Sequence, residues 1–357
     1  MAKEMKYGVM FFTNQPMPEL VRQAQLAEEL GFNSLWLLDS QLVGREVYVA
    51  MTACALNTKR IRIGPGVTHT VTRHPSVTAS GFAALAEVAP GRINLAVGLG
   101  DSAARGIGGR PARLEEFRAD FSMICRLLKG ETVEYKGQSV KIAWIDVGKT
   151  RSIPVLPVPG GPRAHKLCGE LFASGFGEGV IIYCVEPLLK TRLEEIKEGA
   201  AKTGKSVRDI PITWFVQASI SRNLREVKEH LASRFASNMR HRYYDYKRGD
   251  LTDEQLGIPV DLARRFAEEY HFTDHATALS GHAKLIEQVT EDVWEGPLGM
   301  GGRLAGTPEQ ALQVLRKGLQ HEEIQEVVLV LPPPGPAVRL GNEEIMKTFV
   351  KEVMPHG

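Results

Sequence analysis

The sequence predicts an α/β fold and, within that class, a (β/α)8 TIM barrel. Eight apolar segments of strand length alternate with segments whose apolar residues recur at helical spacing along the 357 residues. Polar residues follow several of these strands, whereas a doubly wound sheet, the competing architecture, gathers them at one switch point. The length suits one barrel, in which chemistry lies at the carboxyl ends of the strands.

The first four strand and helix units follow this alternation closely. In the first helix Leu20, Ala24 and Ala27 share one face, and the third helix begins with Pro75, a residue favoured at the first helical position. By the same reasoning we expect strands at 6–12, 34–38, 61–63 and 93–97, followed by helices at 18–30, at 46–56, from 75 and at 114–128.

Two insertions interrupt the alternation in the second half. Residues 131–146 alternate around Lys136-Gly137, which predicts a short hairpin after the fourth helix. Residues 222–302 hold charged helical segments without a strand signal, which predicts a helical insertion between strands 7 and 8. We expect it to cover the active face and to help choose the substrate, within a single domain over residues 1–357. The other strands are expected at 153–158, 179–184, 210–220 and 326–331, with helices at 162–171, from 187, from 307 and at 342–353.

Composition excludes several classes of function. A formal net charge of +2 without a basic block argues against nucleic acid as a partner. No apolar run approaches the roughly 20 residues of a membrane span and no signal-peptide pattern opens the chain, so we expect no membrane partner and a cytoplasmic location. The cysteines lack C-x-x-C spacing. No metal is expected, because metal-ligand spacing is missing from the histidines, among them His165, His241, His271, His275 and His282.

Two glycine-containing breaks between strand and helix are candidate binding segments. Gly66-Val67-Thr68 follows the third strand, where a planar ligand can lie against bare backbone. Gly160-Gly161 follows the fifth strand and opens a helix, so its free N–H groups suit a phosphate. Tight turns between strand and helix need the same glycines, and these residues alone leave both interpretations open.

Polar side chains at strand ends are the second group of candidates. Asp39 ends the second strand and Asp101-Ser102 follows the fourth, where each contacts a ligand or caps a helix. His69 and Arg73 lie just after the third strand, on the active face of a barrel. Because no nucleophile motif accompanies them, the pattern is typical of chemistry carried by a bound cofactor.

Several short motifs together carry a resemblance to a known family. They are Gly66–Pro75, Gly91-Arg92, Gly98–Ser102, Gly160–Pro162 with Gly169-Glu170, and Gly306–Glu309. In this order they resemble the bacterial luciferase-like superfamily, nearest to the branch that contains coenzyme F420-dependent methylenetetrahydromethanopterin reductase. The resemblance spans nearly the whole chain, including the helical insertion.

The resemblance implies a set of cofactor-binding residues. In this family a non-prolyl cis peptide at the end of strand 3 supports the centre of a flavin or deazaflavin ring, and it matches Gly66-Val67, followed by Thr68. The strand 2 acid that touches the cofactor matches Asp39. The other implied residues are Gly100 and Asp101 after strand 4, Gly160 and Gly161 at the phosphate, and Tyr183 and Cys184 at the end of strand 6.

Two positions depart from the family pattern. Many relatives have a catalytic His directly after the strand 2 acid, and this chain has Ser40. Relatives that form an oxygen adduct on FMN often have Asn near the end of strand 4, where this chain has Ala96. Without the usual His, we expect His69 and Asp101 to be the catalytic side chains, since histidine's ordinary pKa of about 6.5 suits proton transfer.

The resemblance implies a flavin- or deazaflavin-dependent oxidoreductase that acts on a small organic substrate by hydride transfer at the cofactor ring. FMN and coenzyme F420 both remain open as the cofactor. One alternative is a two-component FMN-dependent monooxygenase, which uses O2 and reduced flavin from a separate flavin reductase. The other alternative is a non-catalytic flavin-binding barrel. We also expect a homo-oligomer, either a dimer or a tetramer.

Overall fold

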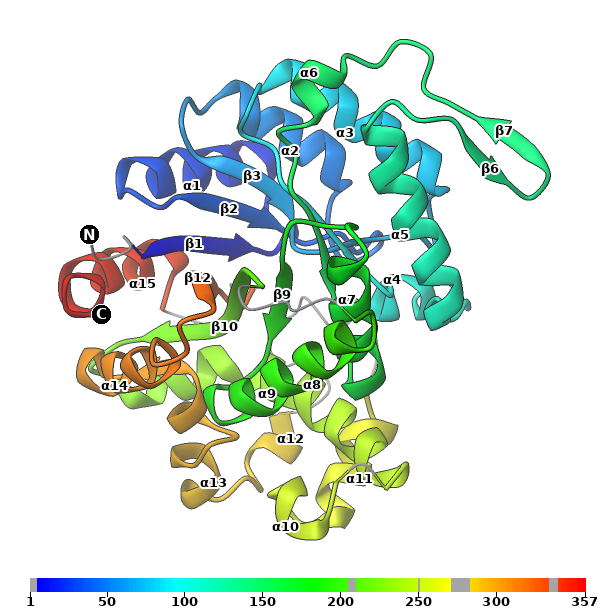
Figure 1. The fold of residues 1–357 in the computed structure, drawn as a ribbon. Coiled ribbons are helices and arrows are strands. Elements are labelled where there is room, and N and C mark those ends of the chain that lie inside the picture. The colour runs from blue at the N-terminus through cyan, green and yellow to red at the C-terminus, as the bar shows by residue number, and fades with distance from the viewer. Residues whose placement is uncertain (1–4, 205–209, 250, 271–282, 334–339) are drawn as a thin grey trace. The chain divides into compact units, whose positions relative to one another are not determined.

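Strands and helices alternate along the chain in a computed structural model that describes residues 5–204, 210–249, 251–270, 283–333 and 340–357 (Figure 1). Contacts within the chain group it into two units. The first consists of Met1–Cys184, Leu188–Phe215 and His321–Val328, and the second of Val185–Pro187, Val216–Gln320 and Leu329–Gly357. A single domain over residues 1–357 therefore stays a prediction.

Eight strands form the predicted barrel: β1 (Lys6–Phe11), β2 (Ser34–Leu37), β3 (Arg62–Pro65), β5 (Leu95–Gly98), β8 (Val155–Val158), β9 (Val180–Tyr183), β10 (Ile212–Ile220) and β12 (Ile324–Val330). Neighbours pair in the order β10, β12, β1, β2 and β3, while β9 pairs with β10 and β5 with β8. Ile63 and Ile93 bridge β3 to β5, and the amide of Glu178, before β9, donates to the carbonyl of Val155 at 3.1 Å. These links close the ring of strands and confirm the predicted fold class.

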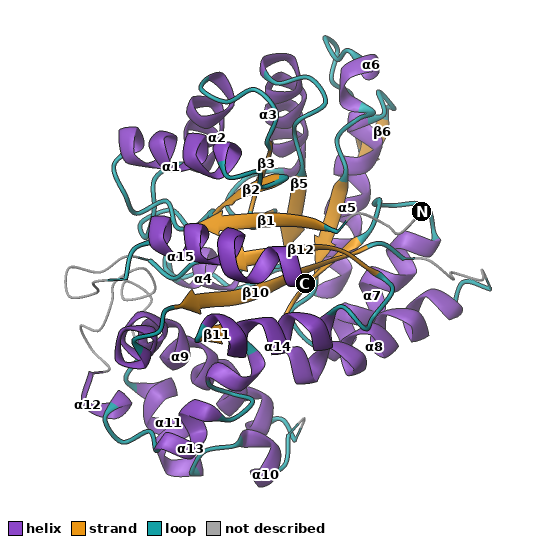
Figure 2. Cartoon of the chain, turned by 90° about the vertical axis from the view of Figure 1, so that its left-hand side faces the viewer, coloured by secondary structure: helices purple, strands orange, loops and turns teal. Residues whose placement is uncertain are grey.

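The helices of the first unit confirm the predicted alternation. They are α1 (Met17–Glu29), α2 (Val47–Leu56), α3 (Pro75–Val88), α5 (Leu114–Leu128), α7 (Pro162–Ala173) and α8 (Leu189–Ala201). The 3-10 turn η1 (Glu186–Leu188), which precedes α8, begins in the second unit. Figure 2 shows α1, α2 and α3 in one layer outside β1, β2 and β3. Two short helices, α4 (Asp101–Arg105) and α6 (Val147–Thr150), were not predicted.

The predicted hairpin consists of β6 (Val133–Tyr135) and β7 (Gln138–Val140), which pair antiparallel. Its turn uses Lys136 at φ 49° and Gly137 at φ 76°, the positive angles that two-residue hairpin turns require. The Tyr135 ring meets His74 edge to face, with centroids 4.9 Å apart. The hairpin therefore contacts the segment that leads into α3.

The second unit is mainly helical in its described residues. Its elements include α9 (Leu224–Lys247), α10 (Asp253–Leu256), α11 (Val260–Glu268), α12 (Ala283–Ile286), α13 (Glu291–Glu295), the 3-10 turn η3 (Met300–Gly302), β11 (Leu304–Gly306), α14 (Pro308–Gly318), α15 (Asn342–Thr348), the short π-helix η4 (Phe349–Val353) and the 3-10 turn η5 (Met354–His356). The described part of 222–302 contains no strand, as predicted for the insertion. The short β11, which pairs with the end of β10, was not predicted. None of the described helices has the length and apolar character that a membrane crossing requires.

Candidate active site

The peptide bond between Gly66 and Val67 is cis, as the family resemblance implies, and it lies between β3 and the short strand β4 (Thr68–His69). A Cβ added at Gly66 would lie 3.1 Å from both Met10 Sδ and Trp36 Cβ, so glycine allows this close packing without displacing either side chain. Beyond the cis bond, β4 pairs in parallel with the end of β5. The structure confirms the geometry of this segment, and its contact with a cofactor stays a prediction.

Two glycines near the end of β5 make room for the side chains that follow the cis bond. A Cβ added at Gly98 would lie 2.9 Å from Val67 Cγ2. One added at Gly100, where φ is +80°, would lie 3.0 Å from His69 Cβ and Cγ. Val67 therefore packs on the last residue of β5, and His69 packs on the backbone just after it.

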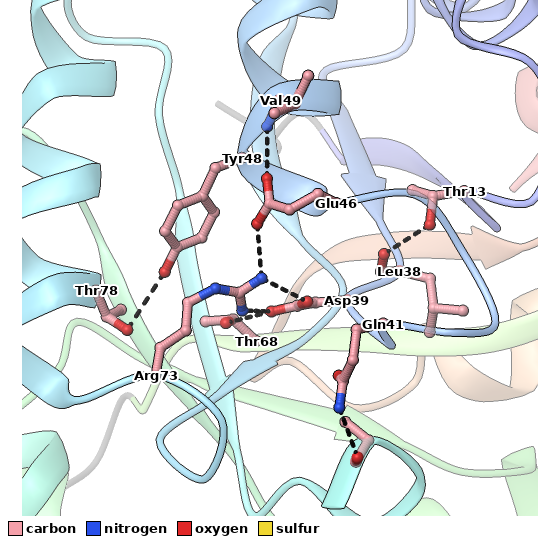
Figure 3. Close-up of polar contacts among 11 residues, drawn as sticks. Thr13, Leu38, Asp39, Gln41, Glu46, Tyr48, Val49, Thr68, Arg73 and Thr78 are labelled. Atoms are coloured by element: carbon pink, nitrogen blue, oxygen red, sulfur yellow. Dashed lines mark hydrogen bonds and ion pairs between the residues drawn. The ribbon is translucent and has the colours of Figure 1, made fainter. Parts of the chain in front are cut away.

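Asp39, at the end of β2, is the centre of a buried polar cluster (Figure 3). Its Oδ2 accepts a hydrogen bond from Thr68 Oγ1 and another from Arg73 Nη1, both at 2.6 Å. Its Oδ1 accepts from Arg73 Nη2 at 3.3 Å. Parallel neighbouring strands thus bring the predicted residues Asp39 and Thr68 together with Arg73, a candidate by its position after the third strand to which the sequence assigned no role.

Arg73 also has partners on α2. Its Nη2 donates to Glu46 Oε1 at 2.7 Å, and its guanidinium lies 4.6 Å from the centroid of the Tyr48 ring. The Tyr48 hydroxyl donates in turn to Thr78 Oγ1 at 3.3 Å. Burial opposes the charged form of Arg73, but the hydrogen bond and charge of Asp39 outweigh it and raise the pKa of Arg73. The arginine is therefore a permanent cation beside Asp39.

His69 is 2% exposed, and neither ring nitrogen has a hydrogen-bond partner among the described residues. Burial lowers the pKa of His69, Asp39 opposes the shift, and Arg73 adds to it. The imidazole is consequently neutral at pH 7. A buried donor and a buried acceptor without partners cost free energy, which is typical of a group that awaits a ligand.

Asp101 belongs to a different set of contacts. It lies in the first turn of α4, where its Oδ1 accepts from Arg105 Nε at 2.7 Å on a half-exposed surface. Ser102 Oγ lies 3.5 Å from Ser40 Oγ, so the two hydroxyls connect the ends of strands 2 and 4. A catalytic role for Asp101 stays a prediction.

The predicted phosphate segment opens α7. Gly161 has φ +141°, and among the described residues no atom lies within 4 Å of a Cβ added there; a Cβ added at Gly160 would lie 3.9 Å from Leu99 Cδ1. The carbonyl of Gly161 accepts from buried His165, whose Nδ1 lies 2.7 Å away. His165 therefore holds the glycine carbonyl inward, while the turn leaves room beside the helix N-terminus for an anion.

The last two predicted residues end strand 6 of the barrel. Tyr183 is 39% exposed, and the carbonyl of half-buried Cys184 accepts from Trp214 Nε1 at 3.0 Å. Within the described residues no group of histidines, cysteines and carboxylates has the arrangement of a metal site. His271, His275 and His282 lie outside the described residues.

Comparison with known proteins identifies the family of the barrel that carries these features. The family model for luciferase-like monooxygenases matches residues 5–321. The chain belongs to this family. The resemblance inferred from the motifs is thereby confirmed.

Individual relatives agree with the predicted branch. The chain is 26% identical to the 5,10-methylenetetrahydromethanopterin reductase of Methanopyrus kandleri over 99% of each chain. It is 32% identical to the F420-dependent glucose-6-phosphate dehydrogenase of Rhodococcus erythropolis, over 59% of this chain and 67% of the relative. The solved structure of the coenzyme F420 dependent tetrahydromethanopterin reductase from Methanopyrus kandleri superposes with a TM-score of 0.76 at 23% identity over 99% of each chain. This similarity covers the whole fold.

Proposed function

We propose that the chain is a coenzyme F420-dependent oxidoreductase that transfers a hydride between the deazaflavin ring and a small organic substrate. The observation that carries the proposal is the unpartnered, buried His69 beside the Asp39 cluster, on the segment that begins with the cis Gly66-Val67 bond. The relatives named for F420-dependent reactions support this cofactor, and they agree with the predicted oxidoreductase class.

The described residues fit a planar ring with polar edges. The backbone at Gly66-Val67 is the proposed surface for the ring, and Asp39 offers an acceptor for an N–H or O–H group. The neutral His69 offers one donor and one acceptor that the protein does not use. Gly160 and Gly161 offer amide donors at a helix N-terminus, which suit the phosphate of the same cofactor.

The bound deazaflavin supplies the hydride chemistry, and the protein supplies binding and proton handling. Asp39 orients the ring by accepting a hydrogen bond on Oδ1. A neutral imidazole accepts a proton on its unprotonated nitrogen, so His69 is suited to take a proton from a substrate hydroxyl during oxidation. Ser40 cannot replace the histidine of other relatives in this step, because its hydroxyl does not ionise near pH 7. Asp101 is the second candidate for a proton acceptor.

Cofactor titration tests the proposal. We expect the purified protein to bind F420, followed by the fluorescence of the deazaflavin, and to bind FMN more weakly. Binding of FMN alone would instead favour the two-component monooxygenase with its separate flavin reductase. Failure to bind either would contradict both readings.

A matched pair of variants tests the phosphate segment. Gly160→Asp and Gly160→Asn differ in charge but not in size, and neither requires an unusual backbone angle at this position. If the phosphate lies at this turn, the aspartate variant should bind cofactor at least about tenfold more weakly than the asparagine variant, a difference of about 1.4 kcal/mol. Equal affinities would place the phosphate elsewhere.

We also propose that the protein is a cytoplasmic homo-oligomer, a dimer or a tetramer. Support comes from α2, which is apolar on its outer side as well as its inner side: Val49 and Leu56 are 60% and 69% exposed. On α3, Val77 and Val88 also share an exposed face. Exposed apolar residues gathered on neighbouring helices are typical of interfaces. Light scattering should give the mass of two or four chains, and the mass of one chain would contradict the proposal.

A further inference from the structure

The two oxygens of the Asp39 carboxylate differ in the number and length of their hydrogen bonds (Figure 3). Oδ2 accepts two short hydrogen bonds, from Thr68 and Arg73, each at 2.6 Å. Oδ1 accepts one long hydrogen bond, at 3.3 Å from Arg73. An ionised carboxylate has about four lone-pair positions, so Oδ1 retains capacity for a further donor. The contacts therefore fix the plane of the carboxylate and leave Oδ1 as the oxygen for a ligand.

Arg73 is itself anchored from the side opposite Asp39. Glu46 caps α2 by accepting the amide of Val49 on Oε2 at 2.9 Å, and its Oε1 accepts from Arg73 at 2.7 Å. The Tyr48 ring lies against the guanidinium. A planar guanidinium held at several points can impose one orientation on a carboxylate, which a flexible ammonium cannot do.

Exposure distinguishes this ion pair from the surface pairs of the chain. The side chains of Arg73 and Asp39 are 17% and 2% exposed, whereas those of Arg22 and Glu19 on α1 are 51% and 35% exposed. Burying a carboxylate is costly, and an apolar pair of similar size often stabilises a fold equally well. A buried charge next to the unpartnered His69 is therefore better explained by ligand binding than by stability alone.

We infer that Arg73 is a positioning residue, which holds Asp39 as a fixed anionic acceptor for an N–H or O–H group of the cofactor ring. The inference rests on the proposed function, because it assigns Asp39 to the ring. It predicts that Arg73 affects cofactor binding only through Asp39. An arginine that merely stabilises the junction with α2 would instead act independently of that carboxylate.

A double-mutant cycle separates these two roles. Dissociation constants for F420 are measured for the parent, Arg73→Met, Asp39→Asn and the double variant, with thermal unfolding as a check on folding. Each single change should weaken binding by about tenfold or more, the loss typical of a charged hydrogen bond. The double variant should bind no more weakly than Asp39→Asn, because the arginine then has no carboxylate to orient. Losses that multiply in the double variant would overturn the inference.

Three further variants make the result specific. Arg22→Met removes an exposed ion pair and should bind as the parent does. Arg73→Lys keeps the charge but not the planar fork, so its affinity should lie between those of the parent and Arg73→Met. Glu46→Gln removes the charge that pairs with Arg73 and leaves Asp39 unchanged. The loss of F420 affinity that it causes should be absent when Asp39 is already replaced by Asn. Should Arg73→Met fail to fold, the Glu46→Gln cycle decides, and a loss that persists there refutes the inference.

The same cycle remains informative if the proposed function fails. A parent that binds FMN and not F420 refutes the proposed cofactor, and the cycle is then run with FMN, where non-additive losses still support the role of Arg73. A parent that binds neither cofactor refutes both proposals.

Discussion

Replacing Gly100 by alanine tests the packing on which the candidate site depends. The residue has φ +80°, a backbone conformation that side chains other than glycine rarely adopt. The added methyl would also lie 3.0 Å from Cβ and Cγ of the buried His69. Two separate costs therefore arise, one from the backbone angle and one from the contact with the imidazole.

Gly108 provides a control that isolates the second cost. It has φ +77°, and no atom of the part of the chain that the structure describes lies within 4 Å of a Cβ added there. Gly108→Ala should therefore cost only the backbone term, about 1–2 kcal/mol. Gly100→Ala should cost the same amount plus about 1–3 kcal/mol for overpacking, because Cβ and Cγ of His69 cannot move as the end of a long side chain can.

Urea unfolding of both variants, followed by circular dichroism, measures the difference. We expect Gly100→Ala to unfold at a lower urea concentration than Gly108→Ala, with a free energy of unfolding that is lower by at least about 1 kcal/mol. We also expect Gly100→Ala to bind cofactor more weakly, because His69 is displaced. Equal unfolding midpoints, together with unchanged cofactor affinity in Gly100→Ala, would refute the contact between His69 and Gly100.

Three further predictions follow from other parts of the chain. Burial lowers the pKa of His230 to about 4, below its value in the unfolded chain. The contribution of neutral His230 to the free energy of unfolding is therefore complete above about pH 6.5 and is lost as the pH falls towards 4. Urea unfolding at pH 7 and pH 4 should therefore show that the parent loses about 3 kcal/mol more than His230→Gln, and equal losses would contradict this. Burial raises the pKa of Cys54 and Cys125 to about 12, so iodoacetamide should label half-buried Cys184 before these two. Bound cofactor should slow the labelling of Cys184, and mass spectrometry of the labelled peptides checks both expectations. Gly169→Ala would drive a methyl into the carbonyl of Ile196 where α7 crosses α8, and thermal unfolding should show a loss of more than about 3 kcal/mol, while a loss below about 1 kcal/mol would refute that crossing.

The strands and long helices were predictable because their patterns are local. The apolar run of 180–183 and the hairpin turn at Lys136-Gly137 carry the signal in adjacent residues. The one-turn helix α4 and the three-residue strand β11 escaped prediction, because segments of five and three residues are too short to show a period. Tertiary pairing decides their structure.

The site was predictable only in part. Motif resemblance located the cis bond and Asp39, since both belong to the short segments that the family shares. The role of Arg73 depends on a contact between the loop after β4 and the end of β2, which no periodicity in the sequence encodes. The sequence did offer one signal for this contact, because a basic residue follows one strand and an acid lies at the end of the neighbouring strand. Asp101, the other side chain expected to be catalytic, forms its described ion pair with Arg105, and its role stays a prediction.

The packing of Val67 on Gly98 ties together two positions that are distant in sequence. Because a methyl at 98 would collide with Cγ2 of Val67, the volume available at one position depends on the residue at the other. Natural drift or a library that varies position 98 alone should therefore return glycine. When both positions vary, a larger residue at position 98 can be accommodated by a smaller residue at position 67, and alanine at both positions is the most conservative such pair. Homologous chains should accordingly show these two positions changing together, so a residue next to the cis bond at the end of strand 3 should evolve in step with a glycine on the neighbouring strand.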